Sequence, residues 1–510
     1  MRAGRSFTRM AQPPVLALLA AALYVAAQPG VGWWPLAWIA LVPLLLAGST
    51  SRPLAGAGLG VIFAVAAAFG VSSWLPAMIA GYFGAPPLAA WPLALLAWLA
   101  FAALPFAVLG AWLAWASSRG PVAPLVVAAA FTVCEYARAN GPVADPWALL
   151  AVSQTAWPLA VQTADLAGPY APGFIVAAFN ALLAGLLEPR LRGARPRSAA
   201  AAVLAVVASS GVYGFAQLQR DPEAGVALRV ALAHAGIEPE RRYLPAFVGD
   251  NLARHLALTR AAAEQAPDVV FWPELALDFH VQTDTDRRNQ ILDAVPLGGA
   301  ELVAGGLGLR RGAEGEVERL NSVFLFRDAA LLGHTDKVLL MPFSETVPLA
   351  RLLGLGPDPF AAGERPRLLH LRRARLGVAV CSEAMHPAYV RRLVRAGAEI
   401  LVNPSQDGWF GSASAARQQL AAVTLRAIET RRFLVRPVAG GYAAVVDPMG
   451  RVIAASRYSE RGVLSAQVYA RNDATLYVRA GDWLPGLAFA LIFYDGITRF
   501  FRRSRSVTRF

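Results

Sequence analysis

Long, nearly charge-free apolar runs between residues 12 and 216 constrain this chain more than any other feature of its sequence. A transmembrane helix needs about 20 mainly apolar residues. The first run has a basic start, as a secretory signal does, but a second run follows at once, which favours an uncleaved first span. The sequence predicts about eight spans, at residues 12–28, 32–49, 55–80, 87–116, 120–139, 166–187, 198–216 and 483–497.

Composition divides the chain into three predicted parts. Residues 1–216 form a polytopic α-helical membrane domain with seven spans, and residues 217–480 have the mixed composition of a globular domain. Residues 481–510 hold the last span and a basic tail. A composition that is 56 % hydrophobic and 16 % charged is too apolar for an ordinary soluble protein, which supports this division.

The positions of the arginines predict the orientation of the spans. Loops on one side of an eight-span arrangement carry fourteen of them: Arg2, Arg5, Arg9, Arg52, Arg119, Arg190, Arg192, Arg195, Arg197, Arg499, Arg502, Arg503, Arg505 and Arg509. The opposite loops carry almost none. By the positive-inside rule both termini are cytoplasmic, so the 217–480 domain is expected to face outward, into a periplasm or its equivalent.

The same arginines explain the net charge of the chain. Together with Glu188 they account for the whole formal charge of +13, so the rest of the chain is about neutral. No basic face remains that would bind nucleic acid, and we exclude that class of partner. Membrane lipids are the expected surroundings.

The two cysteines, Cys134 and Cys381, lie in different predicted parts of the chain. They do not form a disulfide framework, and no metal-ligand spacing accompanies them. The sequence implies no metal and no organic cofactor. Cys134 is expected to be a small buried residue of a span, whereas a free thiol such as Cys381 in an oxidising compartment is either used or deeply buried.

Short apolar runs alternate with helical patterns in the globular part, which predicts an α/β fold with helices covering the sheets. The expected strands are 226–235, 267–274, 299–308, 321–328, 331–340, 374–383, 398–405, 432–439, 442–450 and 462–468. The expected helices are 244–265, 413–430 and one that begins near Pro387.

Three of these strands end in chemically active groups: Glu274 after "FWP", Lys337 after "HTD" and Cys381 after "GVAV". Lys337 is the only lysine in the chain, although 47 residues are basic. Lysine is a compact point charge, whereas the arginine guanidinium is larger and delocalised. In this set a thiolate is the nucleophile, Glu274 the proton acceptor, and Lys337 with a backbone N–H after Cys381 holds the oxyanion.

The stretches "FWPE", "HTDK…PFSE" and "GVAVCSE" resemble the signature motifs of the nitrilase, or carbon–nitrogen hydrolase, superfamily. That resemblance implies a Glu–Lys–Cys triad on an αββα sandwich. With seven spans before the domain and one after it, the chain resembles the apolipoprotein N-acyltransferase family over almost its full length. "CEYARA…DPWALLAVSQ" (134–154) and "NPSQDGWFG" (403–411) are similar to further stretches of that family.

The resemblance implies acyl transfer in two steps. Cys381 takes an acyl chain from a phospholipid, such as phosphatidylethanolamine, as a thioester. The α-amino group of a diacylglyceryl-cysteine at the N-terminus of an apolipoprotein then accepts it. The partners are therefore a phospholipid donor and a diacylated apolipoprotein acceptor.

Further residues follow from the same resemblance as supporting or substrate-binding candidates. Glu345 matches a family glutamate and is expected near Lys337. Glu383 either supports the site or caps the next helix. Trp409 and Phe410 either contact acyl chains or belong to the core. Tyr243 matches an aromatic position of the family.

Some positions depart from the family pattern. Ser382 replaces the tyrosine that usually follows the nucleophile, and His234-Ala235-Gly236 replaces a Gln-Gly-Asn stretch. Glu135 and Arg138 lie at a predicted membrane edge, where ionisable residues are often functional; a mutual pair on one helix is the other interpretation.

Three other functions stay open. A membrane-tethered amidase would use the same triad with water as the acceptor, although one anchor would be enough for it. An acyltransferase could act on a different amine, as the departures near Ser382 and His234 allow. A non-catalytic scaffold is the third, and it would tolerate loss of the only lysine.

Overall fold

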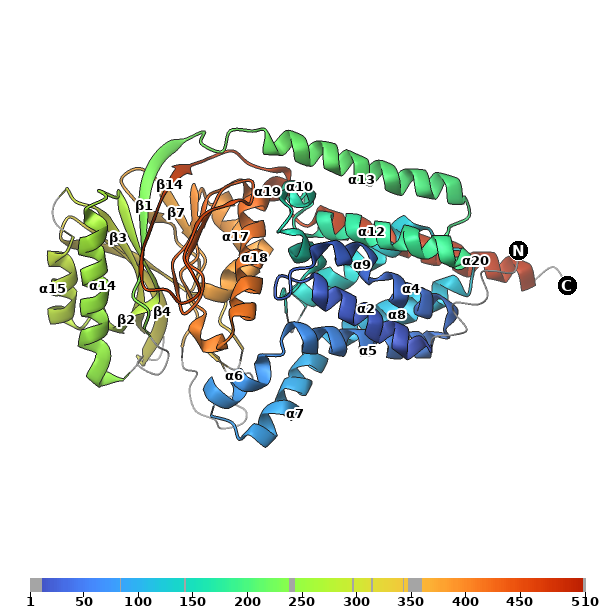
Figure 1. Ribbon diagram of the computed structural model, residues 1–510, viewed down its shortest axis with the longest axis horizontal. Coiled ribbons are helices and arrows are strands. Elements are labelled where there is room, and N and C mark those ends of the chain that lie inside the picture. The colour runs from blue at the N-terminus through green and yellow to red at the C-terminus, as the bar shows by residue number, and fades with distance from the viewer. Residues whose placement is uncertain are drawn as a thin grey trace. The chain divides into compact units, whose positions relative to one another are not determined.

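The computed structural model describes residues 12–82, 84–141, 144–237, 244–295, 298–312, 315–342, 344–346 and 360–507 (Figure 1). These residues form two compact units. One unit contains the described residues of 1–220, 417–425 and 480–510, and the other contains those of 221–416 and 426–479.

Helices are the regular secondary structure in the described residues of the first unit. Its longer helices are α2 (Pro13–Ala27), α4 (Val42–Thr50), α5 (Pro53–Val71), α6 (Leu75–Tyr82), α7 (Pro87–Trp98), α8 (Leu104–Ser117), α9 (Pro124–Asn140), α12 (Tyr170–Leu187), α13 (Pro196–Leu218) and α20 (Trp483–Val507). A π-helical turn, η3 (Leu99–Ala103), joins α7 to α8. Many of these helices have proline in their first turn, where the missing N–H removes no helical hydrogen bond.

Five helical segments in the described residues are long and apolar enough to cross a membrane. They are Pro53–Val71, Pro87–Ser117, Tyr170–Leu187, Pro196–Leu218 and Trp483–Phe501. Shorter apolar helices lie at Pro13–Ala27 and Trp34–Thr50. The predicted span 55–80 is interrupted, because α5 ends at Val71 and a separate helix begins at Leu75. The structure therefore has an apolar helical membrane domain.

Glycines let α5 and α8 approach each other closely. A Cβ atom added at Gly60 would lie 2.0 Å from the Phe106 carbonyl oxygen, and one at Gly110 would lie 2.1 Å from that of Gly56. Any side chain at these positions would force the helices apart. Packing through small residues is how helices associate in lipid, where apolar burial gives little driving force.

The second unit contains two six-stranded sheets. The first has the order β14-β1-β2-β3-β4-β5, and the second has the order β13-β12-β10-β8-β7-β6. The strands of the first sheet are β1 (Val226–His234), β2 (Val269–His280), β3 (Glu301–Arg311), β4 (Val317–Arg327), β5 (Ala330–Asp336) and β14 (Gly462–Ala470). Those of the second are β6 (Leu369–His370), β7 (Arg375–Val378), β8 (Ile400–Val402), β10 (Leu434–Arg436), β12 (Ala444–Val446) and β13 (Val452–Ala455). Three adjacent strands in each sheet run parallel to one another. They are β1, β2 and β3 in the first sheet and β7, β8 and β10 in the second.

The two sheets pack face to face over one apolar core. Leu228, Phe271 and Val303 from the first sheet and Val378 and Val435 from the second belong to the same buried cluster. The other face of the first sheet is covered by α14 (Val248–Ala263) and α15 (Thr285–Asp293), whose apolar side chains join a second cluster. Helix α17 (Pro387–Arg395) packs against β7 of the second sheet. The layers are those of the predicted αββα sandwich.

Several predicted strand boundaries were wrong, and three of them lie beside the predicted site residues. Strand β2 does not end at Glu274 but continues to His280. Strand β5 ends at Asp336 rather than 340, and β7 ends at Val378, before Cys381. The run 432–439 forms two short strands, β10 and β11 (Val438–Ala439), because Pro437 has no N–H to donate to a ladder. Apolar residues continue past each of these strand ends, so the hydrophobic periodicity of the sequence did not reveal where the strands end.

Candidate active site

Glu274 lies in a bulge within β2. The pairing of β2 with β3 is regular up to Trp272 and resumes at Leu277 in a shifted register. Pro273 cannot donate to the ladder, and Leu275 adopts a positive φ of 50°. Bulges of this kind redirect a side chain and are common beside active sites. Here the bulge removes Glu274 from the alternating pattern of the strand.

The close approach of β3 beneath this bulge requires a glycine. A Cβ atom added at Gly305 would lie 2.4 Å from the Pro273 carbonyl oxygen and 2.7 Å from Cα of Glu274. No side chain fits between these backbones. Gly305 therefore fixes how closely the backbone of Glu274 approaches β3.

Lys337 follows directly after β5. Its backbone N–H donates to the Asn321 carbonyl at 2.8 Å, and its own carbonyl accepts from the Gly363 N–H at 2.8 Å. The side chain is almost fully buried. Its Nζ atom lies 2.7 Å from Oε2 of Glu345 and 3.6 Å from Oε1 of Glu274. Two carboxylates therefore compensate the one buried ammonium.

Cys381 begins the short 3₁₀ turn η8 (Cys381–Met385) after β7. Its φ of 50° lies in the left-handed region, which is strained for a residue with a side chain. The backbone N–H of Cys381 is held by the Pro404 carbonyl at 2.8 Å. Asn403 Nδ2 donates to the carbonyl of Ala379 at 2.7 Å and to that of Cys381 at 3.1 Å, which stabilises the turn.

The three predicted residues meet in one buried cluster. The Cys381 thiol makes a hydrogen bond with the Glu274 carboxylate, and Lys337 is electrostatically coupled to both. Asn321, which the sequence analysis missed, joins two of the acids: its Nδ2 donates to Glu274 at 2.8 Å and to Glu345 at 3.1 Å. An asparagine at the start of a predicted strand carries no sequence signal that would have distinguished it from an ordinary polar residue.

A second buried network contacts Cys381 through Ser405 and continues to Asp407 and Arg436. The Ser405 hydroxyl lies 3.5 Å from the Cys381 sulfur and donates to Asp407 at 2.8 Å. Arg436 Nη2 donates to both oxygens of Asp407 at 3.0 Å, and its Nε donates to Asn403. Asp407 and Arg436 are completely buried. Ser405 and Asp407 lie within the stretch 403–411, and Arg436 lies in the predicted strand 432–439, but the sequence analysis assigned them no role.

Glu383 ties the lysine segment to the cysteine turn. One of its oxygens accepts from the N–H groups of Val338 at 2.7 Å and Leu339 at 2.9 Å, and the other accepts from Val380 at 2.8 Å. The carboxylate thus binds the chain on both sides of the cluster. The two predicted roles of Glu383 were support of the site and capping of the next helix. Its contacts hold the segment after Lys337 and also the Val380 N–H at the start of η8.

Burial and neighbouring charges set the protonation of the cluster. Burial, and next the Glu274 carboxylate, raise the pKa of the Cys381 thiol to about 12, against the opposing effect of Lys337. Burial also raises the pKa of Glu274, although Lys337 opposes it. Burial acts to lower the pKa of Lys337, but Glu345 and Glu274 outweigh it and hold that pKa above its ordinary value. At neutral pH the resting nucleophile is therefore a thiol and not a free thiolate.

The structure describes three further predicted residues, Ser382, Trp409 and Phe410. Ser382 follows the nucleophile at a partly exposed position. Trp409 and Phe410 stack with ring centroids 4.6 Å apart, and Phe410 is buried, as the core interpretation expects. Tyr243 lies outside the described residues.

Comparisons with known proteins agree with the geometry. The carbon–nitrogen hydrolase family matches residues 229–472, and the apolipoprotein N-acyltransferase N-terminal domain matches residues 20–182. Apolipoprotein N-acyltransferase of Geobacter metallireducens is 30 % identical over 480 residues, which are 92 % of this chain and 91 % of the relative. That of Azotobacter vinelandii is 31 % identical over 94 % of this chain and 93 % of its own length.

These similarities extend over both units and not only over the catalytic one. The N-terminal match falls on the apolar helices, and the hydrolase match includes Glu274, Lys337 and Cys381. The chain therefore belongs to the apolipoprotein N-acyltransferase family and carries a carbon–nitrogen hydrolase domain.

Proposed function

We propose that this chain transfers an acyl group from a membrane phospholipid to the N-terminal amine of a diacylglyceryl-cysteine in apolipoproteins, through a thioester on Cys381. The observation that carries this proposal is the buried cluster of Glu274, Lys337 and Cys381. It occurs in a chain whose described residues also include five apolar helices of spanning length. Both substrates are lipids, so an enzyme held in the bilayer meets them where they reside.

In the first step, the Cys381 sulfur attacks the carbonyl carbon of an acyl ester while Glu274 takes the thiol proton. A pKa of about 12 for the thiol makes this general-base assistance necessary near neutral pH. The oxyanion of the tetrahedral intermediate is stabilised by the Lys337 ammonium and the backbone N–H of Ser382. The ester C–O bond breaks, Glu274 returns the proton to the glyceryl oxygen, and a lysophospholipid leaves.

In the second step, the amine of the acceptor attacks the thioester carbonyl. Glu274 takes a proton from the amine, and Lys337 again stabilises the oxyanion. The C–S bond breaks, the proton returns to the Cys381 sulfur, and the amide product leaves. Glu345 holds the ammonium in place at 2.7 Å, and Glu383 fixes the two chain segments that carry Lys337 and Cys381.

The membrane arrangement is part of this proposal. Eight spans in a bacterial inner membrane, with both termini cytoplasmic, leave the catalytic domain on the periplasmic side. The arginine-rich loops on one side of the spans support this orientation. The preferred donor is phosphatidylethanolamine, and Trp409 contacts its acyl chains.

Intact mass spectrometry tests the first step. The purified protein is incubated with phosphatidylethanolamine in detergent, beside Cys381→Ala and the matched variant Cys134→Ala. We expect a hydroxylamine-labile gain of one acyl chain in the native protein and in Cys134→Ala, and none in Cys381→Ala. Intact lipid with no adduct in any sample contradicts the phospholipid donor.

A synthetic diacylglyceryl-cysteine peptide then tests the second step. Added to the acylated protein, it should gain one acyl chain as the adduct disappears. Transfer to a simple amine but not to this peptide would favour an acyltransferase with a different acceptor, and release of free fatty acid alone would favour the amidase.

A further inference from the structure

The sulfur atom of Cys381 has a second polar neighbour besides the Glu274 carboxylate. The Ser405 hydroxyl oxygen lies 3.5 Å from this sulfur, a hydrogen-bonding distance for so large an atom, and 2.8 Å from Oδ1 of Asp407. A serine hydroxyl carries one hydrogen and rotates about its C–O bond. Ser405 can therefore donate to the carboxylate or to the sulfur, but not to both at once.

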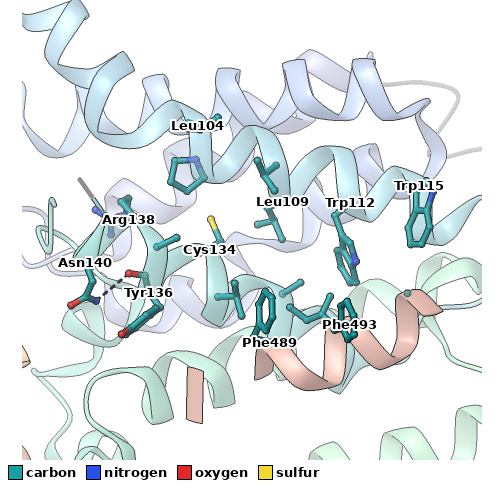
Figure 2. Close-up of a pocket in the computed structure, with 18 of the residues that line it drawn as sticks. Leu104, Leu109, Trp112, Trp115, Cys134, Tyr136, Arg138, Asn140, Phe489 and Phe493 are labelled. Carbon is teal, nitrogen blue, oxygen red and sulfur yellow. Dashed lines mark hydrogen bonds between the residues drawn. The ribbon is translucent and has the colours of Figure 1, made fainter. Parts of the chain in front are cut away.

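The other cysteine of the chain has different surroundings. Cys134 of α9 lines an apolar pocket of the membrane domain together with Leu109 of α8 and Phe489 of α20 (Figure 2). In Figure 2 its sulfur makes no hydrogen bond to the pocket residues drawn. Burial of a thiol in this protein therefore does not by itself bring a hydroxyl group beside it, and the hydroxyl next to Cys381 is a feature of the site.

Asp407 keeps its charge compensated when the hydroxyl turns away from it. Nη2 of Arg436 donates to both carboxylate oxygens at 3.0 Å, and neither side chain is exposed. The guanidinium is itself held by the Asn403 side-chain oxygen and the Tyr442 carbonyl, each at 3.1 Å. The buried carboxylate thus retains two charge-assisted hydrogen bonds, so the hydroxyl hydrogen can leave it at small cost.

The backbone fixes the position of the aspartate. Strand β9 (Ser405–Gln406) pairs in parallel with β11, and the Asp407 N–H donates to the Ala439 carbonyl at 2.8 Å. A Cβ atom added at Gly441 would lie 2.4 Å from Oδ2 of Asp407. The chain approaches the carboxylate so closely that only glycine fits there. Asp407 therefore holds the Ser405 hydroxyl at one place beside the sulfur.

The two proposed steps make opposite demands on the sulfur. In the first step the tetrahedral intermediate must expel the glyceryl oxygen and keep the C–S bond. In the second step it must keep the new C–N bond and expel the sulfur, which takes the electron pair of the C–S bond. A hydrogen-bond donor that stabilises negative charge on sulfur therefore assists the second step and not the first.

We infer, on the premise of the proposed function, that Ser405 is a catalytic residue of the second step. As the C–S bond breaks, its hydroxyl turns from Asp407 and donates a hydrogen bond to the departing sulfur, while keeping its own proton. The proton of the acceptor amine then passes through Glu274 to the sulfur, so the products are the amide and the free thiol. Asp407 and Arg436 are positioning residues, because they act on the sulfur only through the hydroxyl.

Single-turnover mass spectrometry on the full-length protein in detergent tests this inference. Incubation with phosphatidylethanolamine gives the rate of thioester formation, and later mixing with a synthetic diacylglyceryl-cysteine peptide gives the rate of thioester loss. Ser405→Ala should slow thioester loss about tenfold more than thioester formation, the effect of removing one hydrogen bond to a charged group. With both substrates present, the thioester should accumulate in this variant.

Ser322→Ala is the matched control. The Ser322 hydroxyl is as fully buried as that of Ser405 and also donates to an aspartate, Asp336, at 2.6 Å, but this pair joins β4 to β5. Its loss should leave the ratio of the two rates at the native value, even if both rates fall. Ser405→Thr keeps a hydroxyl and should restore the native ratio, which a merely structural role would not require.

Ser405→Gly gives a second test that does not depend on the folding of Ser405→Ala, since it removes the hydroxyl and leaves room for water beside Asp407. A native ratio of the two rates in either variant, with thioester formed, overturns the inference and leaves the proposed function standing. A ratio in Ser405→Thr as altered as in Ser405→Ala also overturns it. No thioester in the native protein would contradict the proposed function itself, and this inference with it.

Discussion

Nζ of Lys337 lies 2.7 Å from Oε2 of Glu345, and both side chains are buried. The contact places the only lysine of the chain in a space that two carboxylates and the nucleophile share. Removing either member of a buried ion pair leaves an uncompensated charge, which costs about 3–5 kcal/mol. The pair therefore holds the ammonium at one position, as an oxyanion-binding group requires.

Lys337→Arg is expected to lose at least about 100-fold in the rate of thioester formation, the usual effect of removing one oxyanion donor. The guanidinium is larger than the ammonium and spreads its charge, so it cannot occupy the same space between Glu345 and Glu274. The rate is measured by mass spectrometry after rapid mixing with phospholipid. Arg457→Lys, at an exposed position, is the control for a charge-conserving exchange, and a Lys337→Arg variant of native rate contradicts the assigned role.

Asn321→Ala is expected to move the acidic limb of the pH profile of kcat/KM to higher pH. The Asn321 amide donates to Glu274 at 2.8 Å, and this bond lowers the pKa of a carboxyl that burial has raised. Without the bond the pKa of Glu274 rises further, so the base form appears only at higher pH. The measurement is kcat/KM as a function of pH.

Asn403→Ala serves as the matched control for this prediction. Asn403 is equally buried, but its amide donates to the carbonyl groups of Ala379 and Cys381 and not to an acid. Its loss should reduce activity without displacing the limb. Identical displacement in the two variants would show that Asn321 acts only through the stability of the fold.

Gly305→Ala tests whether the bulge positions the base. The new Cβ would lie 2.4 Å from the Pro273 carbonyl, so the bulge must move, which costs about 1–3 kcal/mol of unfolding free energy. A shift of about 1 Å in Glu274 lowers the rate up to about 100-fold. Gly333→Ala, on β5 with open space around it, is the control for both thermal unfolding and rate. An unchanged rate in Gly305→Ala contradicts the link between bulge and base.

Much of this architecture could be predicted from the sequence, because its signals are local. Long apolar runs predict helices wherever they lie, and the motifs around Glu274, Lys337 and Cys381 are contiguous. The bulge at Glu274 could not be predicted, since it depends on a positive φ at Leu275 and on Gly305 of the neighbouring strand. Register and long-range contacts of that kind leave no periodic pattern.

The sequence analysis missed three residues of the site for a similar reason. Asn321, Asp407 and Arg436 are polar residues in otherwise apolar strands or turns, and their burial became visible only when the strands were assembled. Asp407 and Arg436 are 29 residues apart and fully buried against each other, and composition and hydropathy do not detect such a long-range pair. The number of membrane spans and the three-part division of the chain stay predictions.

His386 gives the second unit a predicted sensitivity to acid. Burial, assisted by the charge of Arg426, lowers the pKa of His386 to about 4, whereas in the unfolded chain it titrates near 6.5. Between these two values the unfolded state binds a proton that the folded state does not. The free energy of unfolding therefore falls as pH decreases from about 6.5 to 4, by up to about 3 kcal/mol, and falls no further from this group below pH 4.

Thermal unfolding in detergent across pH 4–8 measures this effect as a difference between the native protein and His386→Gln. Taking this difference removes the contributions that other groups make to the free energy of unfolding between pH 4 and 8. One of them is Glu383, whose pKa burial raises to about 7 and whose contribution has the opposite sign. His386→Gln should lose less of its melting temperature on acidification than the native protein does. His370→Gln, on an exposed position of β6, is the matched control for removal of a histidine. Parallel pH curves for native protein and His386→Gln would mean that His386 binds its proton equally well in both states, and would rule out burial as a force that lowers its pKa.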